Sequence, residues 1–300
     1  RQIACDLDFL RSIGIHGNAP ALATPTPPDF TAFLDDMRAA KRAGASAPWL
    51  AYAPLKRLLA REGEMAPSVL ADLAERLEAA GLPRPIWSLA DEPGNADQSA
   101  DGLRATARKL RAAVPDVRLA GHLNARHDVA LAPLFDVILI NQGFGIDEKS
   151  IAAAADAWPE VWLYNTGRPR LTAGLWLWAT GARRYLQWHA RMPTADPFDP
   201  LDGREGDVQM IYPRARPCPH QPNIDRRLLE MAQGITDGRW LAWLDAQTGS
   251  GARALRRRIR QRLGKTWAHA SRLDAAELAA IRQEIVALAK SQQQDARDDQ

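Results

Sequence analysis

The chain has 300 residues, of which 46% are hydrophobic and 25% charged, and its formal net charge is +3. These are values of a globular protein, and the longest apolar runs fall short of the roughly 18 residues that a membrane-spanning helix needs. The basic excess is local, since residues 253–265 hold seven basic residues and no acid, which argues against a nucleic-acid-binding protein as a whole. Cys5 and Cys218 are far apart and indicate neither a disulfide framework nor a metal knuckle.

The chain begins at Arg1, without a methionine or a signal peptide. Its first periodic segment, near residues 4–13, is already helical. We therefore expect the segment to be clipped from a longer protein, so that a missing leader says nothing about its destination.

Short apolar runs then alternate with helical stretches nearly to the C-terminus. The predicted strands lie within residues 15–25, 47–54, 84–93, 117–126, 135–145, 160–167 and 183–191, and the predicted helices are 29–43, 67–80, 100–113, 128–134, 148–158, 172–180 and 223–244. Seven strand–helix units behind a leading helix predict an α/β fold, a (β/α)8 TIM barrel that lacks its first strand at the clipped N-terminus. A doubly wound open sheet is the alternative, but no glycine-rich phosphate fingerprint follows any strand.

We expect the catalytic barrel to occupy residues 1–247 and a basic, helical, partly disordered C-terminal extension to occupy residues 248–300. Residues 193–222 form a proline-rich loop after the last strand, and loops of this length are usually functional. The extension contains an amphipathic helix at 274–294. We interpret it as a solvated helical appendage; a basic surface for an acidic polymer is the alternative.

Catalytic groups of a barrel lie where strands end and loops begin. Polar and aromatic residues suited to a hydroxylated ligand stand at these positions: Asn18, Tyr52, Asp91, Glu92, His122, Asn124, Asn141, Gln142, Tyr164, Asn165, Trp188 and His189. They lack the clustered histidines and carboxylates of a metal site, so we expect no metal. The chain also has ten tryptophans against four tyrosines, and tryptophan stacks on sugar rings, although it also fills cores.

Two adjacent acids, Asp91 and Glu92, close an apolar strand that becomes the fourth when the missing strand is counted. Many barrel glycosidases place their general acid there. An ordinary retaining enzyme needs a second carboxylate about 5 Å away as nucleophile. The seventh strand, which commonly supplies it, ends in Tyr164 and Asn165, and Glu160 lies at its opposite end. The usual nucleophile is therefore absent.

A glycosidase without its own nucleophile can use the carbonyl oxygen of a 2-acetamido group on the substrate. This chemistry needs one acid to protonate the leaving oxygen and one carboxylate to orient the amide nitrogen. We expect Asp91 to stay ionised beside the amide, and Glu92, facing a like charge, to hold its proton near neutral pH. The alternative is a solvated turn that starts the next helix, since acids favour helix N-termini.

The stretch LADEPGN resembles the acid pair of glycoside hydrolase family 123, the β-N-acetylgalactosaminidases. The region from Arg170 onward resembles the related glycoside-hydrolase-like domain of unknown function 4091, so that together the two cover roughly residues 85–245. The positions that match the latter are Trp178, Trp188, Asp196, Gly206, Asp207, Tyr212, Pro213, Arg227, Gly234 and Asp237. Arg184 departs from the pattern, because relatives often have glycine in that turn.

The resemblance implies a (β/α)8 catalytic domain, often preceded by a β-sandwich, in a retaining glycosidase that uses substrate assistance and is secreted or periplasmic. Glu92 matches its acid/base and Asp91 its amide-orienting carboxylate. We expect further contacts to the sugar from Tyr164, Asn165, Trp188, His122, Asn141, His189 and Tyr212, each of which could instead be structural.

We therefore expect a glycoside hydrolase that cleaves a β-linked 2-acetamido sugar by substrate-assisted retention, with a carbohydrate as its partner, no nucleic acid and no metal or organic cofactor. One alternative is an inverting glycosidase of other specificity, with Asp207 or Asp196 as a distant base. The other is a barrel that binds glycans without cleaving them.

Overall fold

The computed structural model describes residues 2–16, 19–45, 47–94, 99–157, 160–190, 210–212 and 223–298. The described chain divides into two compact units. Unit 1 holds residues up to 145 together with 156–162, and unit 2 holds 146–155, 163–213 and the chain from 223 onward. Asn18, Asp196 and Asp207, which the sequence analysis singled out, lie outside the described residues.

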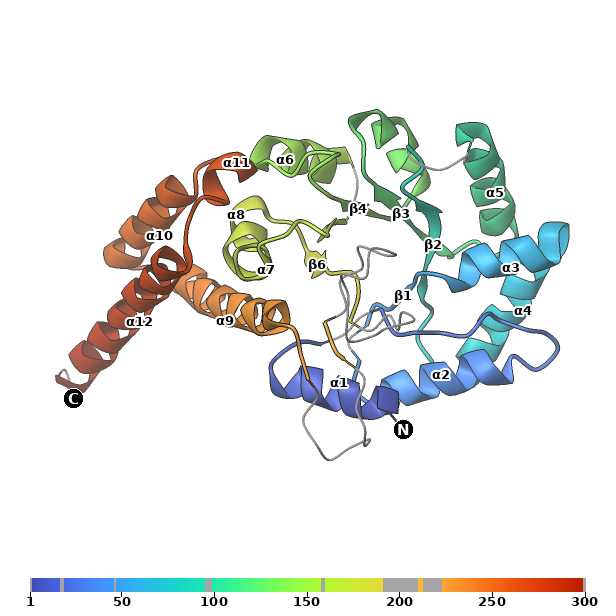
Figure 1. The fold of residues 1–300 in the computed structure, drawn as a ribbon, viewed down its shortest axis with the longest axis horizontal. Helices are drawn as coiled ribbons and strands as arrows, with labels where there is room; N and C mark the ends of the chain where they lie inside the picture. Colours follow the sequence, from blue (N-terminus) through green and yellow to red (C-terminus); the bar gives the residue numbers. More distant parts are fainter. Residues whose placement is uncertain are drawn as a thin grey trace. The chain divides into compact units, whose positions relative to one another are not determined.

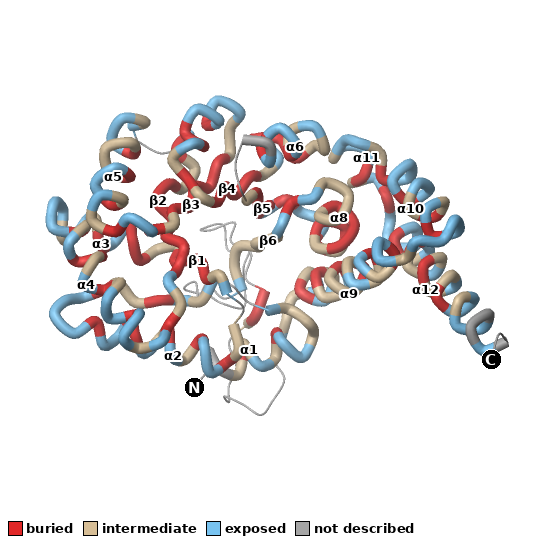
Figure 2. The backbone as a smooth tube through the Cα atoms, turned by 180° about the vertical axis from the view of Figure 1, so that it is seen from behind, coloured by how far each residue is buried: buried red, intermediate tan, exposed pale blue. Residues whose placement is uncertain are grey.

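Strands β1 to β4 lie in unit 1, and each pairs in parallel with the next in chain order. They comprise Leu50–Ala51 (β1), Ile86–Asp91 (β2), Arg118–Leu123 (β3) and Val137–Ile140 (β4). Their residues are apolar almost throughout and are buried along most of their length, as parallel strands covered on both faces require (Figure 2). Asp91 pairs with His122, so the carboxyl ends of β2 and β3 lie level.

Two further strands, Val161–Tyr164 (β5) and Arg184–Leu186 (β6), complete a six-stranded sheet with the order β1-β2-β3-β4-β5-β6. The predicted α/β fold with a parallel sheet is therefore confirmed, as are six of the seven predicted strands. The described part of residues 15–25 forms no strand. Pro20 and Pro25 lack the N–H groups that a strand interior needs. The closed eight-stranded barrel stays a prediction.

Helices cover the strands of unit 1 (Figure 1). Its helical segments are Gln2–Ser12 (α1), Thr31–Arg42 (α2), Pro54–Glu62 (α3), Gly63–Met65 (η1), Ala66–Ala79 (α4), Ala100–Ala113 (α5) and Arg126–Leu134 (η2). The buried face of α2 brings Phe33 against Trp87 of β2, with ring centroids 5.7 Å apart. Helix α5 begins where predicted, because the Ser99 hydroxyl caps it by accepting from Gly102 N. Helix α3, which follows β1 directly, lies outside every predicted helix.

The helical segments of unit 2 are Glu148–Ala157 (α6), Pro169–Leu171 (α7), Thr172–Trp176 (η3, a π-helical turn), Leu177–Thr180 (α8), Arg226–Ala246 (α9), Ser250–Leu263 (α10), Trp267–Ala270 (α11) and Ala275–Asp298 (α12). The segment from α7 to α8 lies directly against α9. A Cβ at Gly234 would stand 2.3 Å from the carbonyl oxygen of Arg170, and one at Gly174 would stand 2.4 Å from that of Gly234. Only glycine permits this backbone contact.

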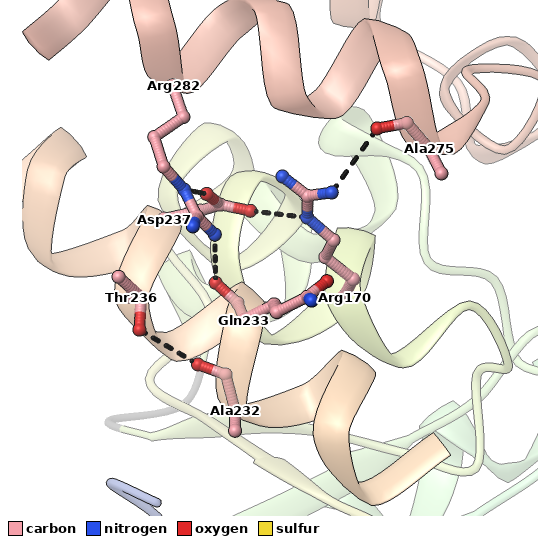
Figure 3. Close-up of polar contacts among 7 residues, drawn as sticks. All are labelled: Arg170, Ala232, Gln233, Thr236, Asp237, Ala275 and Arg282. Atoms are coloured by element: carbon pink, nitrogen blue, oxygen red, sulfur yellow. Dashed lines mark hydrogen bonds and ion pairs between the residues drawn. The ribbon is translucent and has the colours of Figure 1, made fainter. Parts of the chain in front are cut away.

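The C-terminal helices pack on α9. The predicted amphipathic helix is observed as α12, and its apolar residues are buried with those of α10: Leu255, Ile259, Leu263, Leu278, Ile281 and Ile285. At the buried Asp237 of α9, which is 3% exposed, two guanidinium groups converge (Figure 3). Arg170 Nε donates to Asp237 Oδ2 at 2.9 Å, and Arg282 Nε of α12 donates to Oδ1. This ion cluster ties α7, α9 and α12 together.

The basic stretch of the extension is largely paired within unit 2. Arg258 and Arg262 both contact Glu284. Arg260 donates to the carbonyl oxygen of Ala179 at 2.9 Å and lies over the ring of Trp178, 4.3 Å from its centroid. These cations are thus used to dock helices. None of the described helices has both the length and the apolar character needed to cross a bilayer.

Candidate active site

The two adjacent acids lie at the carboxyl end of β2. Asp91 is its last residue, and Glu92 follows with a left-handed backbone (φ 48°) that non-glycine residues rarely adopt. The Glu92 N–H still donates to the carbonyl oxygen of His122 at 2.9 Å, so the chain turns while attached to β3. Adjacent side chains of a regular strand point to opposite faces. The turn at Glu92 ends that alternation, and each acid reaches a residue that follows a neighbouring strand.

Asp91 is held from the end of β1. Tyr52, one residue past that strand, donates its hydroxyl to Asp91 Oδ2 at 2.5 Å. Burial, followed by the hydrogen bond and charge of Asp91 and the charge of Glu92, raises the pKa of Tyr52 well above its ordinary value. The phenol therefore stays protonated near neutral pH.

Glu92 is held from the end of β3. Asn124 Nδ2 donates to Glu92 Oε2 at 3.2 Å. The backbone N–H groups of Asn124 and Ala125 in turn donate to Asp128 Oδ2 at 3.2 and 3.0 Å. Asp128 is 2% exposed, so it shapes the turn after β3 and offers no surface to a ligand.

His122 lies beneath the acids, in the interior of unit 1. Its Nδ1 lies 3.2 Å from Ser88 Oγ and 3.4 Å from the carbonyl oxygen of Ala90, and its ring meets that of Tyr52 edge-on at 5.1 Å. Burial lowers the pKa of His122 to about 4, against the opposing effect of the Asp91 charge. The imidazole is therefore neutral near pH 7 and does not neutralise Asp91. Its contact with a sugar stays a prediction.

Asn141, the fourth predicted site residue in unit 1, follows β4. Its Oδ1 accepts from the backbone N–H groups of Gly143 at 2.9 Å and Phe144 at 3.4 Å. This geometry shapes the turn, and a sugar contact by Asn141 is likewise untested.

The other predicted site residues belong to unit 2. Tyr164 ends β5 and is 5% exposed. Asn165 follows with a left-handed backbone (φ 46°), and its Oδ1 accepts from Trp188 N at 2.9 Å and from Gln187 Nε2 at 3.1 Å. Asn165 thus joins the ends of β5 and β6. Half-buried Trp188 and His189 follow β6, and half-buried Tyr212 donates its backbone N–H to the carbonyl oxygen of Asn223 at 2.9 Å.

Within unit 1 the structure thus brings Asp91, Glu92 and His122 together with Tyr52 and Asn124. The last two were recognised from the sequence only as polar strand-end residues, and no role was assigned to them. Their signal was position, since each stands directly after a strand that flanks β2. Ser88 was missed, although a polar residue inside an apolar strand marks a buried contact.

Other chemistries find less support among the described residues. Glu160 pairs with Arg118 at 3.1 Å and accepts from Trp162 Nε1 at 2.8 Å, at the amino end of β5. It therefore stands at the end of its strand away from Tyr164. No group of three or more histidine, cysteine, aspartate or glutamate side chains in the described parts of the chain is placed to hold a metal ion.

Comparison with known proteins adds no family. A scan against protein-family models gives no match to this chain, and a search of curated proteins gives no relative. The resemblance to glycoside hydrolase family 123 therefore stays a prediction, and the function has to be argued from the chemistry of the acid pair and its partners.

Proposed function

We propose that the chain is a glycoside hydrolase that cleaves a β-linked 2-acetamido sugar by substrate-assisted retention. Glu92 is its acid/base, and Asp91 orients the acetamide group. The observation that carries the proposal is the acid pair at the carboxyl end of β2, where each carboxyl group has its own hydrogen-bond donor from a neighbouring strand.

The left-handed conformation of Glu92 supports a functional interpretation. Such strain in a non-glycine residue is of the order of 1–3 kcal/mol and concentrates at functional sites. A solvated turn that merely starts α5 would not require it, and α5 is capped by Ser99, not by either acid. The strain therefore favours a site over a simple helix start.

The strand ends also support substrate assistance. Strand β5 ends in Tyr164, and Asn165 follows it, at the strand end where we expect a retaining enzyme of the ordinary kind to carry its nucleophile. The proposal includes the closed (β/α)8 barrel, because in that fold the carboxyl ends of all strands open on one face.

The reaction then has two steps. Glu92 gives its proton to the glycosidic oxygen as the bond to C1 breaks, and the acetamide carbonyl oxygen bonds to C1 to form an oxazolinium ion. Asp91 accepts the amide N–H and stabilises the positive charge. Water next attacks C1 and gives a proton to Glu92 while the bond between C1 and the acetamide oxygen breaks and the acetamide is restored, so the sugar leaves with its original β configuration.

Hydrolysis of aryl 2-acetamido-2-deoxy-β-galactosides and β-glucosides tests the proposal. We expect turnover of at least one of them, inhibition by the matching thiazoline, and β-hemiacetal as the first product seen by proton NMR. An α-hemiacetal as first product would support the inverting alternative instead. Saccharide binding with no hydrolysis across the panel would support the non-catalytic alternative.

Glu92→Gln tests the assignment of the acid. We expect the rate for poor leaving groups to fall on the order of 10²–10⁴-fold, and much less for dinitrophenyl glycosides, which need no protonation. Glu64→Gln is the matched control, because Glu64 is exposed and only pairs with Lys109. Equal losses for both kinds of leaving group would remove Glu92 as the acid.

A further inference from the structure

The two acids have partners with different chemical capacities. A tyrosine hydroxyl contacts Asp91 at 2.5 Å, and an asparagine amide contacts Glu92 at 3.2 Å. A carboxyl group that keeps one charge state and a carboxyl group that changes it need different partners. A carboxyl group that changes its charge state needs a partner that can donate to the carboxylate and accept from the carboxylic acid.

Tyr52 directs its hydroxyl proton toward Asp91. Its raised pKa keeps the phenol protonated, so the hydroxyl has a proton to donate to an ionised Asp91. A constant donor favours the ionised carboxylate. The geometry therefore suits a carboxylate that stays charged through the reaction.

Asn124 can act in two directions. Its side chain carries a donor, Nδ2, and an acceptor, Oδ1, which exchange places when the amide turns about its last bond. Oδ1 is buried, and no described residue donates to it. Glu92 is thus the one described partner of this side chain, and no second hydrogen bond locks the amide in the observed orientation.

The backbone on both sides holds this pair in place. The backbone N–H of Asn124 donates to Asp128. The backbone carbonyl oxygen of Asn124 lies so close to Gly143 that a Cβ on residue 143 would stand 2.1 Å from it. The N–H of Glu92 is bound to His122. The backbone positions of the two residues are therefore fixed, while the orientation of the amide depends on the state of Glu92.

We propose that Asn124 is a positioning residue that stabilises Glu92 in both of its protonation states by turning its amide when the proton moves. The inference rests on the proposed function, in which Glu92 loses and regains a proton in every turnover. When Glu92 is a carboxylic acid, its O–H donates to Oδ1 of Asn124. Once the proton has passed to the leaving oxygen, the carboxylate accepts from Nδ2–H until water returns a proton.

NMR tests the coupling without relying on catalysis. In protein labelled with ¹⁵N-asparagine and ¹³C-glutamate, we expect the side-chain amide signal of Asn124 to move over the same pH interval as the carboxyl carbon of Glu92. Asn124→Asp and Glu92→Gln assign the two signals, and the exposed Asn223 supplies a control amide. The movement should disappear in Glu92→Gln. A constant Asn124 signal, or movement that persists in Glu92→Gln, would overturn the proposal.

Kinetics test the same pair in the working enzyme. Asn124→Ala removes both hydrogen bonds, so we expect kcat to fall about tenfold with little change in KM, while the basic limb of the pH–rate profile stays in place. Asn124→Asp adds a negative charge that cannot donate, so the basic limb should move to higher pH. If the basic limb also moves in Asn124→Ala, Asn124 acts only as a donor that stabilises the carboxylate form of Glu92. Loss of melting temperature at an unchanged rate would show a merely structural residue. Either result overturns the inference.

The NMR titration and the activity measurements distinguish a failure of this inference from a failure of the proposed function. Coupled NMR titration in a protein that hydrolyses no glycoside would reject the glycosidase and keep the pairing of Asn124 with Glu92. Hydrolysis without coupled titration would keep the glycosidase and reject the role of Asn124.

Discussion

Asp91 in unit 1 is a half-buried carboxylate and Asp237 in unit 2 is a buried one, and their partners differ in charge. Asp237 is matched by the guanidinium groups of Arg170 and Arg282, on either side of its carboxylate (Figure 3). Asp91 is matched by the neutral hydroxyl of Tyr52 and lies beside a neutral His122. Cations compensate the charge of Asp237, whereas the partners of Asp91 within the described part of the chain are neutral.

The difference separates a structural carboxylate from one that can act on a ligand. A buried charge must be paired or hydrogen-bonded. The guanidinium groups of Arg170 and Arg282 neutralise the charge of Asp237, whereas the neutral Tyr52 hydroxyl is the donor that the described residues supply to Asp91. An uncompensated carboxylate can stabilise positive charge as it develops on a substrate. The ion cluster therefore indicates helix docking, and the neutral described partners of Asp91 fit the catalytic role that we propose for the acid pair.

The largest effect is expected from Asp237→Asn. The substitution leaves two guanidinium groups facing a neutral amide, and breaking a buried ion pair in this way costs about 3–5 kcal/mol. We expect the free energy of unfolding, measured in urea, to fall by that amount while the rate per folded molecule is retained. The control is Asp101→Asn, because Asp101 is exposed and its pair with Arg104 is worth little. A loss below about 1 kcal/mol would place Asp237 among ordinary surface carboxylates.

Asp91→Asn should give the opposite pattern. We expect kcat to fall on the order of 10²–10³-fold, because the charge that supports the oxazolinium is lost. The unfolding free energy should change by less than about 1 kcal/mol, since the Tyr52 hydroxyl can still donate to the new amide oxygen. Stability that falls as far as in Asp237→Asn, with activity kept, would erase the distinction between the two carboxylates.

Much of the fold could be predicted from local pattern. Parallel strands are apolar on both faces, so β2, β3 and β4 stand out as short apolar runs, and helix α5 shows a cap and a periodic face. Helix α3 escaped prediction, because only two residues separate its nine residues from β1, with no turn signal between them. The segment 15–25 was wrongly predicted as a strand, because its apolar content outweighed the two prolines.

The sequence was enough to predict that the site residues lie at the strand ends, but not which of them form hydrogen bonds with one another. The ends of neighbouring parallel strands meet at one edge, which is enough to place Asp91, Glu92 and His122 near one another. The left-handed turn at Glu92 and the choice of Asn124 as its partner depend on backbone geometry over 32 residues of chain. The ion cluster at Asp237 spans 67 residues to Arg170 and 45 to Arg282, distances over which no local pattern carries information.

The charge state of His122 gives a smaller, pH-dependent test of the comparison. Its pKa is about 4 in the folded protein and about 6.5 in an unfolded chain, so the unfolded state binds more protons between these values. Stability should therefore fall as pH drops from 6.5 to 4, by up to about 3 kcal/mol, and level off below.

Urea unfolding across this range measures the His122 effect. The dependence of the unfolding free energy on pH should become weaker in His122→Asn, which keeps a polar atom near Ser88. It should persist in His127→Gln, because the side chain of His127 is 75% exposed. Imidazole carbon signals that report a charged His122 at pH 6 would give Asp91 a cation and break the contrast with Asp237.

Tyr52→Phe should have the smallest effect and the most selective one. It removes the donor to Asp91 and keeps the ring that packs against His122, so we expect kcat/KM to fall about tenfold through a poorly oriented carboxylate. In the proposed mechanism Asp91 acts on the acetamide and not on the leaving oxygen, so the loss should be the same for phenyl and dinitrophenyl glycosides. Tyr185→Phe is the matched control, since that hydroxyl contacts Gln187 rather than an acid. A loss confined to phenyl glycosides would instead connect Tyr52 to proton donation, and the division of labour between Asp91 and Glu92 would have to be reversed.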